Sequence, residues 1–387
     1  MPEPGDHWMV GPYERFYECF PELQKYKDKI HLVYASTHAS YAFNHRDTQN
    51  VIDEVRRARS QGKKKIVFFN GSETFMPSVF FKTQRIAELL TEIPKEDLFY
   101  CVGVPAAQEF YDNVCKERGW SNRMNMLGCH HFESVILKHA KEWEHVLNNM
   151  EYDVRPKDKL FVCFNKVHRR HRIQLLAEAI RNGWLEKSFY SFEGGYPNWY
   201  LDNKPGQWTC SKDDLRAILS IQDKLPLRLN ITPKRVNPVE IHEDDIQYHE
   251  HSYFSIVTET IFEKYDSTKQ PFLMYMDTLF LSEKIYKPLA LKHPFIVFGW
   301  HGSLRELKKR GYKTFHPFID ESYDEEKDDD TRFRMLVEEI QRLEQFTIDQ
   351  WLEWQNNIKP IVEHNYKYLM SLTEHRDGPP VDHLFIN

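Results

Sequence analysis

Short, unbroken apolar runs that alternate with amphipathic segments constrain this chain more than any other feature of its sequence. The clearest runs are Lys65–Phe69, Leu98–Val102, Lys159–Phe164, Tyr253–Val257 and Phe295–Phe298. A run without a polar face is typical of a strand that is buried on both sides, as in a parallel sheet covered by helices. The alternation therefore predicts an α/β fold with parallel sheets and short strand-to-helix connections.

The length of 387 residues favours two domains. Residues 147–158 lose the apolar periodicity and contain a proline, which suits a linker. We expect an N-terminal α/β domain over residues 1–150 and a second α/β domain over residues 156–346. The periodic segment 347–375 predicts a C-terminal helix, interrupted at Pro360, that packs back on the first domain.

Composition excludes several classes of protein. A net charge of -6 is not typical of a protein that holds duplex DNA by general electrostatics. The six cysteines are spread singly, which favours reduced thiols and a cytoplasmic location. No run approaches the roughly 20 apolar residues of a membrane span, and the first residues lack the apolar core of a signal peptide. We therefore expect a cytoplasmic protein without a membrane span.

The first half offers candidate catalytic residues in two loops. Ligands of parallel sheets bind at the carboxyl ends of the strands, so the loops that follow residues 30–35 and Lys65–Phe69 are the places to look. Glu73, just past a buried strand, is the candidate general base, because desolvation would raise its pKa toward neutrality. The alternative is that Glu73 caps the following helix. His38 and Asp47 in the neighbouring loop are further candidates.

The second half opens with a basic turn directly after an apolar run. Asn165 begins this turn, and Arg169, Arg170 and Arg172 lie at the start of the predicted helix. Cations at a helix N-terminus are unfavourable for the helix dipole. A bound diphosphate would balance these arginines. The alternatives are a solvated basic turn and a contact with the phosphates of a nucleic acid.

A second helix start carries a different combination of charges. Ser282 is a good N-cap, and Lys284 beside the free amides of a helix N-terminus favours an anion. A carboxylate repels phosphate, so Glu283 should serve another group, such as ribose hydroxyls. Lys287 follows one turn later. The alternative is an ordinary capped helix with its charges in solvent.

Two further residues are expected near this helix start. Thr258 and Glu259 follow the apolar run Tyr253–Val257 and should lie at the carboxyl edge of the same sheet. We therefore include both among the candidate ligand contacts.

Metal and cofactor motifs are weak or missing. His130 and His131 are adjacent, so their side chains point apart, and the histidines and acids of residues 242–251 match no ligand spacing in what we expect to be a loop. The acidic run Glu321–Asp330 is expected to be a solvated loop, and Asp328-Asp-Asp330 within it is not at a strand end. The chain also lacks GxxxxGK[ST] and GxGxxG motifs. We expect no metal and no cofactor.

Residues Phe280–Tyr286 and Pro294–Gly299 together resemble the donor motif of fucosyltransferase- and exostosin-type families. That motif has an aromatic or aliphatic residue, then Ser or Thr, Glu and Lys, and later a proline before a strand. The chain is thus similar to two-domain nucleotide-sugar glycosyltransferases of the GT-B type. Lys287-Pro288 departs from the usual continuation of the motif, which leaves the donor sugar open.

The motif-level resemblance covers residues 158–325. Within it, Gly311–Phe315 and Asp320–Asp324 are similar to segments of uncharacterised glycosyltransferase-like proteins of large phages and viruses. If the source is a virus, the expected location is the host cytoplasm. The N-terminal half resembles these enzymes only in its architecture.

This resemblance implies two Rossmann-like domains that face a cleft. It also implies an inverting, metal-independent hexosyl- or fucosyltransferase-like enzyme with a GDP- or UDP-linked sugar as donor. The acceptor would be a hydroxyl of a glycan or of modified DNA. Glu283 and Lys284 match the family's ribose-contacting Glu and diphosphate-contacting Lys, and one of Arg169, Arg170 and Arg172 matches the family's arginine.

Two rival hypotheses belong to other classes of protein. The basic cluster of residues 166–172 favours a nucleic-acid-binding or DNA-modifying protein, whereas the net charge opposes it. The other rival is a non-catalytic carbohydrate- or partner-binding protein with the same fold. Such a protein would not bind a nucleoside diphosphate.

Overall fold

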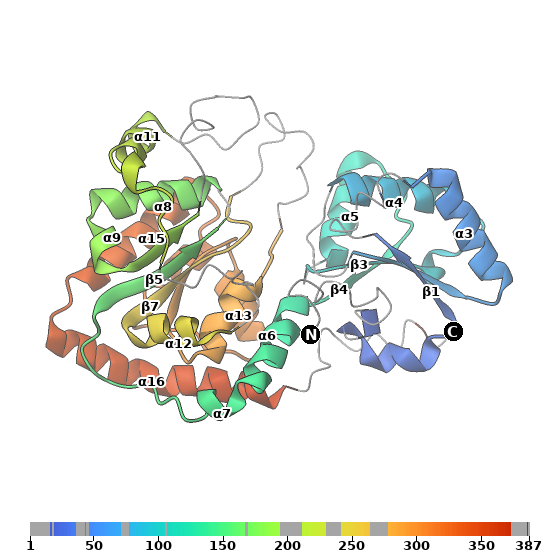
Figure 1. Cartoon of the computed structure of the whole chain (residues 1–387). Helices are drawn as coiled ribbons and strands as arrows, with labels where there is room; N and C mark the ends of the chain where they lie inside the picture. The colour runs from blue at the N-terminus through green and yellow to red at the C-terminus, as the bar shows by residue number, and fades with distance from the viewer. Residues whose placement is uncertain are drawn as a thin grey trace. The chain divides into compact units, whose positions relative to one another are not determined.

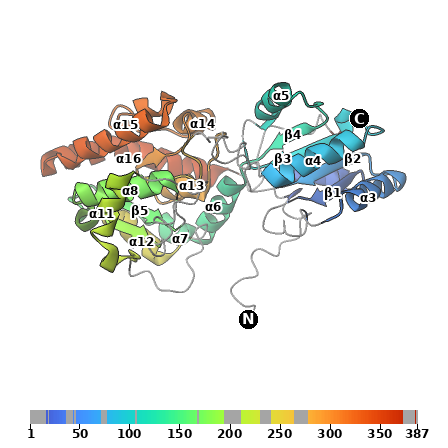
Figure 2. The ribbon, with the colours of Figure 1, turned by 90° about the horizontal axis from the view of Figure 1, so that it is seen from above.

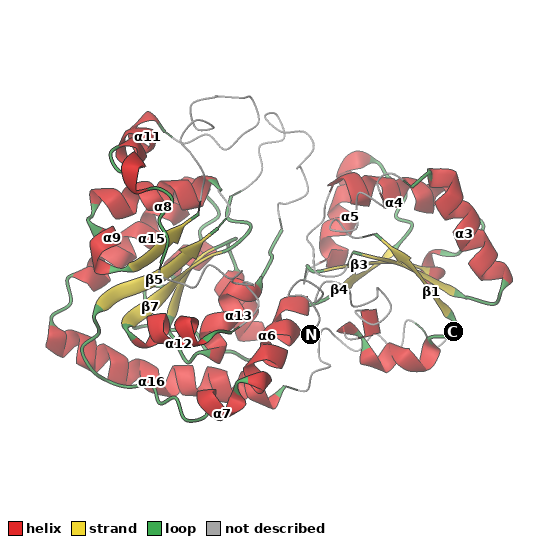
Figure 3. Cartoon of the chain, viewed as in Figure 1, coloured by secondary structure: helices red, strands yellow, loops and turns green. Residues whose placement is uncertain are grey.

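The computed structural model describes residues 16–17, 19–35, 43, 46–70, 77–104, 107–166, 169–193, 211–229, 241–263, 278–372 and 385. It has an α/β fold with two four-stranded sheets whose strands all run parallel (Figures 1 and 3). The α/β class and the parallel sheets predicted from the apolar runs are confirmed. The chain divides into two compact units: unit 1 comprises Met1–Ser134, Tyr265–Phe280 and Thr373–Asn387, and unit 2 comprises Val135–Lys264 and Leu281–Leu372.

The sheet of unit 1 has its strands in chain order, β1-β2-β3-β4. These strands are β1 (Ile30–Tyr34), β2 (Lys65–Phe69), β3 (Leu98–Val102) and β4 (Asn125–Gly128). The connecting helices are α3 (Thr48–Ser60), α4 (Pro77–Leu89) and α5 (Ala107–Arg118). Right-handed crossovers that all step in one direction place these helices on one face of the sheet, as Figure 2 shows.

The opposite face of this sheet is covered by segments from the two ends of the chain. Phe16, Phe20 and Leu23 pack there, the last within a 3-10 helix (Pro21–Tyr26), and Phe385 stacks on Phe99 of β3 with ring centroids 4.7 Å apart. Both faces of β2 and β3 are therefore apolar, which is why these strands read as unbroken apolar runs.

The sheet of unit 2 has the order β6-β5-β7-β8. Its strands are all parallel, but they are added first on one side of β5 and then on the other. The strands are β5 (Lys159–Asn165), β6 (Phe189–Phe192), β7 (Ser252–Thr258) and β8 (Phe295–Phe298). From β5 the chain passes through α8 (Arg170–Arg181) to β6, and it then returns past β5 to form β7. The reversal places α8 on one face and α12 (Glu243–Glu250) and α13 (Glu283–Ala290) on the other (Figure 1).

The remaining helices complete the two units. They are α6 (His131–Glu142), α7 (Glu144–Leu147), α9 (Trp184–Lys187), α11 (Lys212–Leu219), α14 (Ser303–Lys309), α15 (Asp329–Glu344) and α16 (Ile348–Ser371), with 3-10 turns at Lys95–Asp97, Gln222–Lys224 and Ser322–Glu325. The helix α16, expected to pack on the first domain, lies in unit 2 and contacts α13.

Two predictions about helices are wrong, and two short strands were missed. The helix α16 runs through Pro360 without interruption, because Pro360 is exposed and solvent can satisfy the carbonyl that loses its amide partner. Residues 243–250, expected in a loop, form α12. The short strands β4 and β6 were not predicted, since four residues with a polar member give little periodic signal.

The acidic run Glu321–Asp330 is not a solvated loop. Asp324 is buried and accepts hydrogen bonds from the amides of Leu304 and Arg305, both at 2.9 Å, so it satisfies the first turn of α14. Glu321 is also buried and accepts from the hydroxyl of Thr314 at 2.7 Å. Backbone amides and a hydroxyl therefore stabilise these carboxylates inside the protein, and the run ends in α15.

Five cysteines are described, and each is buried and free of disulfides (Cys19, Cys101, Cys115, Cys129 and Cys163). Among the residues described, no helix combines the length and the apolar character needed to cross a bilayer.

Candidate functional site

The strand order of unit 2 reverses between β5 and β7, and this switch point marks where a ligand should bind. In open α/β sheets, ligands occupy the crevice outside the carboxyl ends of the strands at such a switch point. Asn165 ends β5 and Thr258 ends β7, and both are buried. The Thr258 hydroxyl donates to Oδ1 of Asn165 at 2.7 Å, so the two central strand ends are held together.

Two side chains from α8 fix the backbone that follows β7. Nη2 of Arg172 donates to the carbonyl oxygens of Thr258 at 2.7 Å and Glu259 at 3.2 Å, and Nε2 of His171 donates to the same Glu259 oxygen at 3.1 Å. Burial and the neighbouring arginines hold the pKa of His171 well below its ordinary value, so this imidazole is neutral. Burial, with Arg169, lowers the pKa of Arg172 to about 10, which leaves it charged at neutral pH. These two side chains, which we call the frame, fix the position of the backbone at the end of β7.

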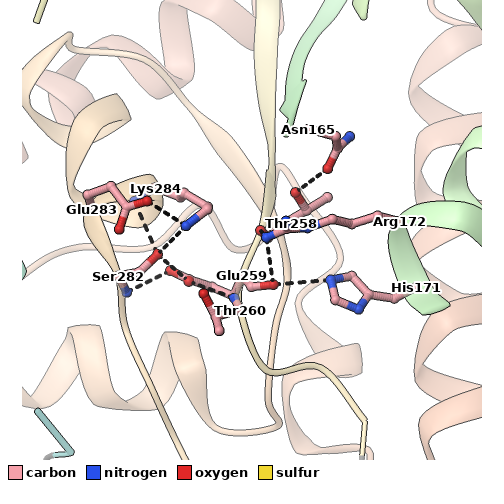
Figure 4. A network of polar contacts seen from close by, with 9 residues as sticks. All are labelled: Asn165, His171, Arg172, Thr258, Glu259, Thr260, Ser282, Glu283 and Lys284. Carbon is pink, nitrogen blue, oxygen red and sulfur yellow. Dashed lines mark hydrogen bonds and ion pairs between the residues drawn. The ribbon is translucent and has the colours of Figure 1, made fainter. Parts of the chain in front are cut away.

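Glu259 connects this frame to the start of α13 (Figure 4). Its side chain is completely buried, and its carboxylate accepts from Ser282 N at 3.0 Å, from Ser282 Oγ at 2.5 Å and from Thr260 N at 3.2 Å. Burial raises the pKa of Glu259, although the charge of Lys284 opposes this shift. Three donated hydrogen bonds stabilise the ionised form and set the position of Ser282.

Ser282 is the N-cap of α13, as predicted: its Oγ accepts from Lys284 N at 3.4 Å. Glu283 and Lys284 form an ion pair of 2.5 Å at the first turn, and Nζ of Lys284 also lies 3.2 Å from Ser282 Oγ. Burial alone would raise the pKa of Glu283, but the Lys284 ammonium and the more distant Arg172 hold it below its ordinary value. The pair is thus ionised, and its carboxylate is almost fully buried.

A second group of charges lies at the N-terminus of α8. Arg169 is the N-cap residue but makes no capping side-chain bond, and burial lowers its pKa. Arg170 pairs with Glu263 at 3.2 Å and with Asp330 at 3.0 Å. Burial raises the pKa of Glu263 to about 7, with Arg170 opposing the shift and Asp329 adding to it.

Most of the predicted second-half residues belong to one connected network. The network shown in Figure 4 comprises Asn165, His171, Arg172, Thr258, Glu259, Thr260, Ser282, Glu283 and Lys284. Lys287 is buried in the last turn of α13, four residues after Glu283 and thus on the same side of the helix. The network contains two carboxylates and two cations besides the neutral histidine, so its charges balance.

The predicted first-half residues are not part of this network. Asp47 is the N-cap of α3 in unit 1, where its Oδ1 accepts from Gln49 N at 2.8 Å and Asn50 N at 3.2 Å. A helix cap accounts for that carboxylate. Glu73 and His38 lie outside the described residues.

Sequence reasoning missed the roles of His171 and Glu263. In the sequence, His171 was one member of a basic cluster. Only the structure shows that its ring donates to the backbone carbonyl of Glu259, the residue that follows β7. Glu263 lies three residues after Thr260 and is the second carboxylate, after Glu259, to follow the end of β7. That repeated carboxylate is the sequence feature that could have identified it. No group of three or more His, Cys, Asp and Glu within the described ranges could hold a metal ion.

Comparisons of the chain with protein-family models, with curated proteins and with solved structures found no match.

The raised pKa of Glu263 leads to a prediction about stability. Because its folded pKa of about 7 lies above the ordinary 4.5, the folded state binds the proton more tightly. Its contribution to the free energy of unfolding is present below pH 4.5 and is lost as the pH rises through 7, by at most about 3 kcal/mol. Glutamine does not titrate, so the melting temperature of wild type should fall relative to Glu263→Gln between pH 5 and pH 8. A difference in melting temperature between wild type and Glu263→Gln that does not change with pH would contradict the raised pKa of Glu263.

Proposed function

We propose that the chain is a glycosyltransferase that moves a sugar from a nucleoside-diphosphate sugar to a hydroxyl acceptor, with the donor bound by unit 2. The observation that carries this proposal is the ion pair between the buried Glu283 and the half-buried Lys284 at the start of α13. It lies in the network that joins the carboxyl ends of β5 and β7, where the fold favours a ligand. A GT-B type arrangement of the two units, each with its own parallel sheet, is part of the proposal.

The roles follow from the contacts within the network. Glu283 would accept hydrogen bonds from ribose hydroxyls, which would release Lys284 from the 2.5 Å pair to face the diphosphate. One of Arg169, Arg170 and Arg172, at the start of α8, would supply the arginine that contacts the diphosphate. Glu259 and Ser282 position the start of α13 and do not contact the donor.

The proposed reaction is a single inverting displacement. A base in the first half of the chain, for which Glu73 is the candidate, takes the proton from the acceptor hydroxyl. The acceptor oxygen then bonds to the anomeric carbon as the bond from that carbon to the diphosphate oxygen breaks. Lys284 and the N-terminus of α13 stabilise the negative charge that develops on the leaving diphosphate.

The nucleic-acid hypothesis receives less support from the same residues. Two members of the basic cluster, His171 and Arg172, are buried and bound to backbone carbonyls, so they cannot reach a nucleic-acid backbone. Salt-dependent retention on heparin or duplex DNA would still separate this class from the transferase. A carbohydrate-binding relative without activity would bind a glycan but no nucleoside diphosphate.

The test is turnover of a panel of UDP-, GDP- and CDP-linked sugars, measured as release of the nucleoside diphosphate with and without a mixture of glycan acceptors. One donor should be consumed faster when an acceptor is present. Absence of release from every donor, together with absence of nucleoside-diphosphate binding, would contradict the proposal.

Activity is predicted to persist in EDTA. Lys284, an arginine and the amides of a helix N-terminus supply the positive potential that a metal ion supplies in other transferases. Release of the nucleoside diphosphate should therefore change less than twofold between buffer with 5 mM EDTA and buffer with manganese or magnesium, on the order of experimental scatter. Complete loss with chelator and recovery with metal would contradict the roles given to these cations.

A further inference from the structure

Glu263 follows the end of β7 in a segment that α8 and α15 hold in place. The ring of His171 in α8, which belongs to the network of Figure 4, stacks on Phe262 with the ring centroids 5.2 Å apart. The guanidinium of Arg332 in α15 lies 4.5 Å from the centroid of the same Phe262 ring and donates to the Phe262 carbonyl. The backbone that leads into Glu263 therefore has a fixed position beside the network.

The two carboxylate oxygens of Glu263 have unequal surroundings. Oε2 accepts from Arg170 at 3.2 Å, and the same guanidinium donates to Asp330 at 3.0 Å. Oε1 is buried and accepts no hydrogen bond from any residue that the structure describes. A carboxylate removed from water needs donors on its oxygens to remain ionised, so this one is only half stabilised. Because the side chain is 14 % exposed, it can still exchange a proton with solvent.

The neighbouring carboxylates are better stabilised as anions. Glu259 accepts the three hydrogen bonds described above. Asp329 pairs with Arg332 at 2.6 Å, and Asp330 is mostly exposed to solvent. Burial has already raised the pKa of Glu263 to about 7. Glu263 is therefore the carboxylate of this region that takes a proton most readily when negative charge is added nearby.

The charges that face Glu263 come from two helices. Arg169 and Arg170 of α8 favour its ionised form, whereas Asp329 and Asp330 of α15 oppose it. A diphosphate bound at the start of α8 would add negative charge and would compete with Glu263 for the same guanidinium groups. Both effects favour the protonated carboxyl group.

We propose that binding of the donor's diphosphate to unit 2 is coupled to the uptake of a proton by Glu263. This coupling rests on the proposed function, because it takes the diphosphate as the ligand of this region. It is also reciprocal: the factor by which the diphosphate raises the proton affinity of Glu263 is the factor by which protonation raises the affinity for the diphosphate. Binding is therefore tightest below pH 7, where free Glu263 is already protonated, and weakens as the pH rises above 7.

The test is calorimetric titration of the whole chain with GDP, UDP and CDP between pH 6.5 and pH 8.5. The affinity of wild type for the nucleoside diphosphate that binds should fall about tenfold over this range, the equivalent of one pKa unit. In Glu263→Gln, which cannot titrate, the affinity should stay level or rise as the terminal phosphate of the ligand loses its own proton.

A second readout uses wild type alone and does not depend on the folding of a variant. At pH 7.5 the observed heat of binding should become more endothermic as the ionisation enthalpy of the buffer increases, because the buffer supplies the proton that the complex takes up. The same titration in Glu263→Gln should show no net uptake.

Glu344→Gln is the matched control for the loss of a partly buried, paired carboxylate. Glu344 is 15 % exposed, pairs with Lys187 at 2.5 Å and ends α15, outside the network. This variant should keep the pH dependence of wild type. Equal pH dependence in wild type and Glu263→Gln, or binding by wild type without proton uptake, would overturn the coupling and leave the proposed function standing. Absence of binding of all three nucleotides at every pH would overturn both.

Discussion

Replacing Lys284 by alanine is expected to weaken the binding of the preferred nucleoside diphosphate by about 10- to 150-fold. A hydrogen bond between charged groups is worth roughly 1.5–3 kcal/mol, and each 1.4 kcal/mol corresponds to a factor of ten in affinity. Lys284 is the half-buried cation of the ion pair at the start of α13, so its removal takes away the proposed contact with the diphosphate. Isothermal titration calorimetry with GDP and UDP on both proteins measures the change.

A control is needed because Lys284→Ala also leaves the buried Glu283 without its counter-charge. Lys308→Ala is the matched control: Lys308 pairs with the buried Glu321 at 3.2 Å, in α14, outside the network. This variant should keep wild-type affinity. Equal losses in both variants would point to a folding defect, and an unchanged affinity in Lys284→Ala would remove Lys284 from the site.

The Glu73→Gln variant is expected to fold and to bind the donor but to lose about 10²–10⁴ in turnover, the usual cost of losing a general base. Glutamine keeps the size and the hydrogen-bonding reach of glutamate and cannot accept the proton. The position of Glu73, four residues after the buried strand β2, motivates the prediction. Single-turnover rates with saturating donor measure the effect.

Helix capping predicts a different result for the same residue. Loss of a cap would lower stability by roughly 1 kcal/mol and would leave kcat nearly intact. Asp47→Asn is a useful comparison, because Asp47 caps α3 and asparagine preserves that role. Near-normal kcat in Glu73→Gln would exclude it as the base and would leave His38 as the next residue to test.

Local pattern was sufficient to predict the strands of the two sheets other than β4 and β6, and the cap of α13. Strands buried on both faces must read as apolar runs, so β2, β3, β5, β7 and β8 could be located from the sequence. Ser282 could be identified because a helix N-terminus needs a side-chain acceptor. These features depend on neighbours in sequence.

The partners of the buried charges could not be predicted from the sequence. Glu259 was expected to contact a ligand, whereas it is fully buried and holds Ser282, 23 residues later. Arg172 was expected to contact a diphosphate, and in the structure it donates a hydrogen bond to the carbonyl of Thr258 at the end of β7. Both outcomes depend on the strand order β6-β5-β7-β8, which brings α8 and the loop after β7 together. Residue types and spacing do not determine that order.

The most direct test of the account is a thermal-shift and calorimetric screen of wild type with GDP, UDP, CDP and their sugars. A ligand at 100 times its Kd adds about 2.7 kcal/mol to the free energy of unfolding, which is easily detected. The account predicts that one nucleoside diphosphate and its sugars raise the melting temperature, and that this rise is lost in Lys284→Ala and kept in Lys308→Ala. Absence of any shift with every nucleotide, in a folded protein, would contradict it.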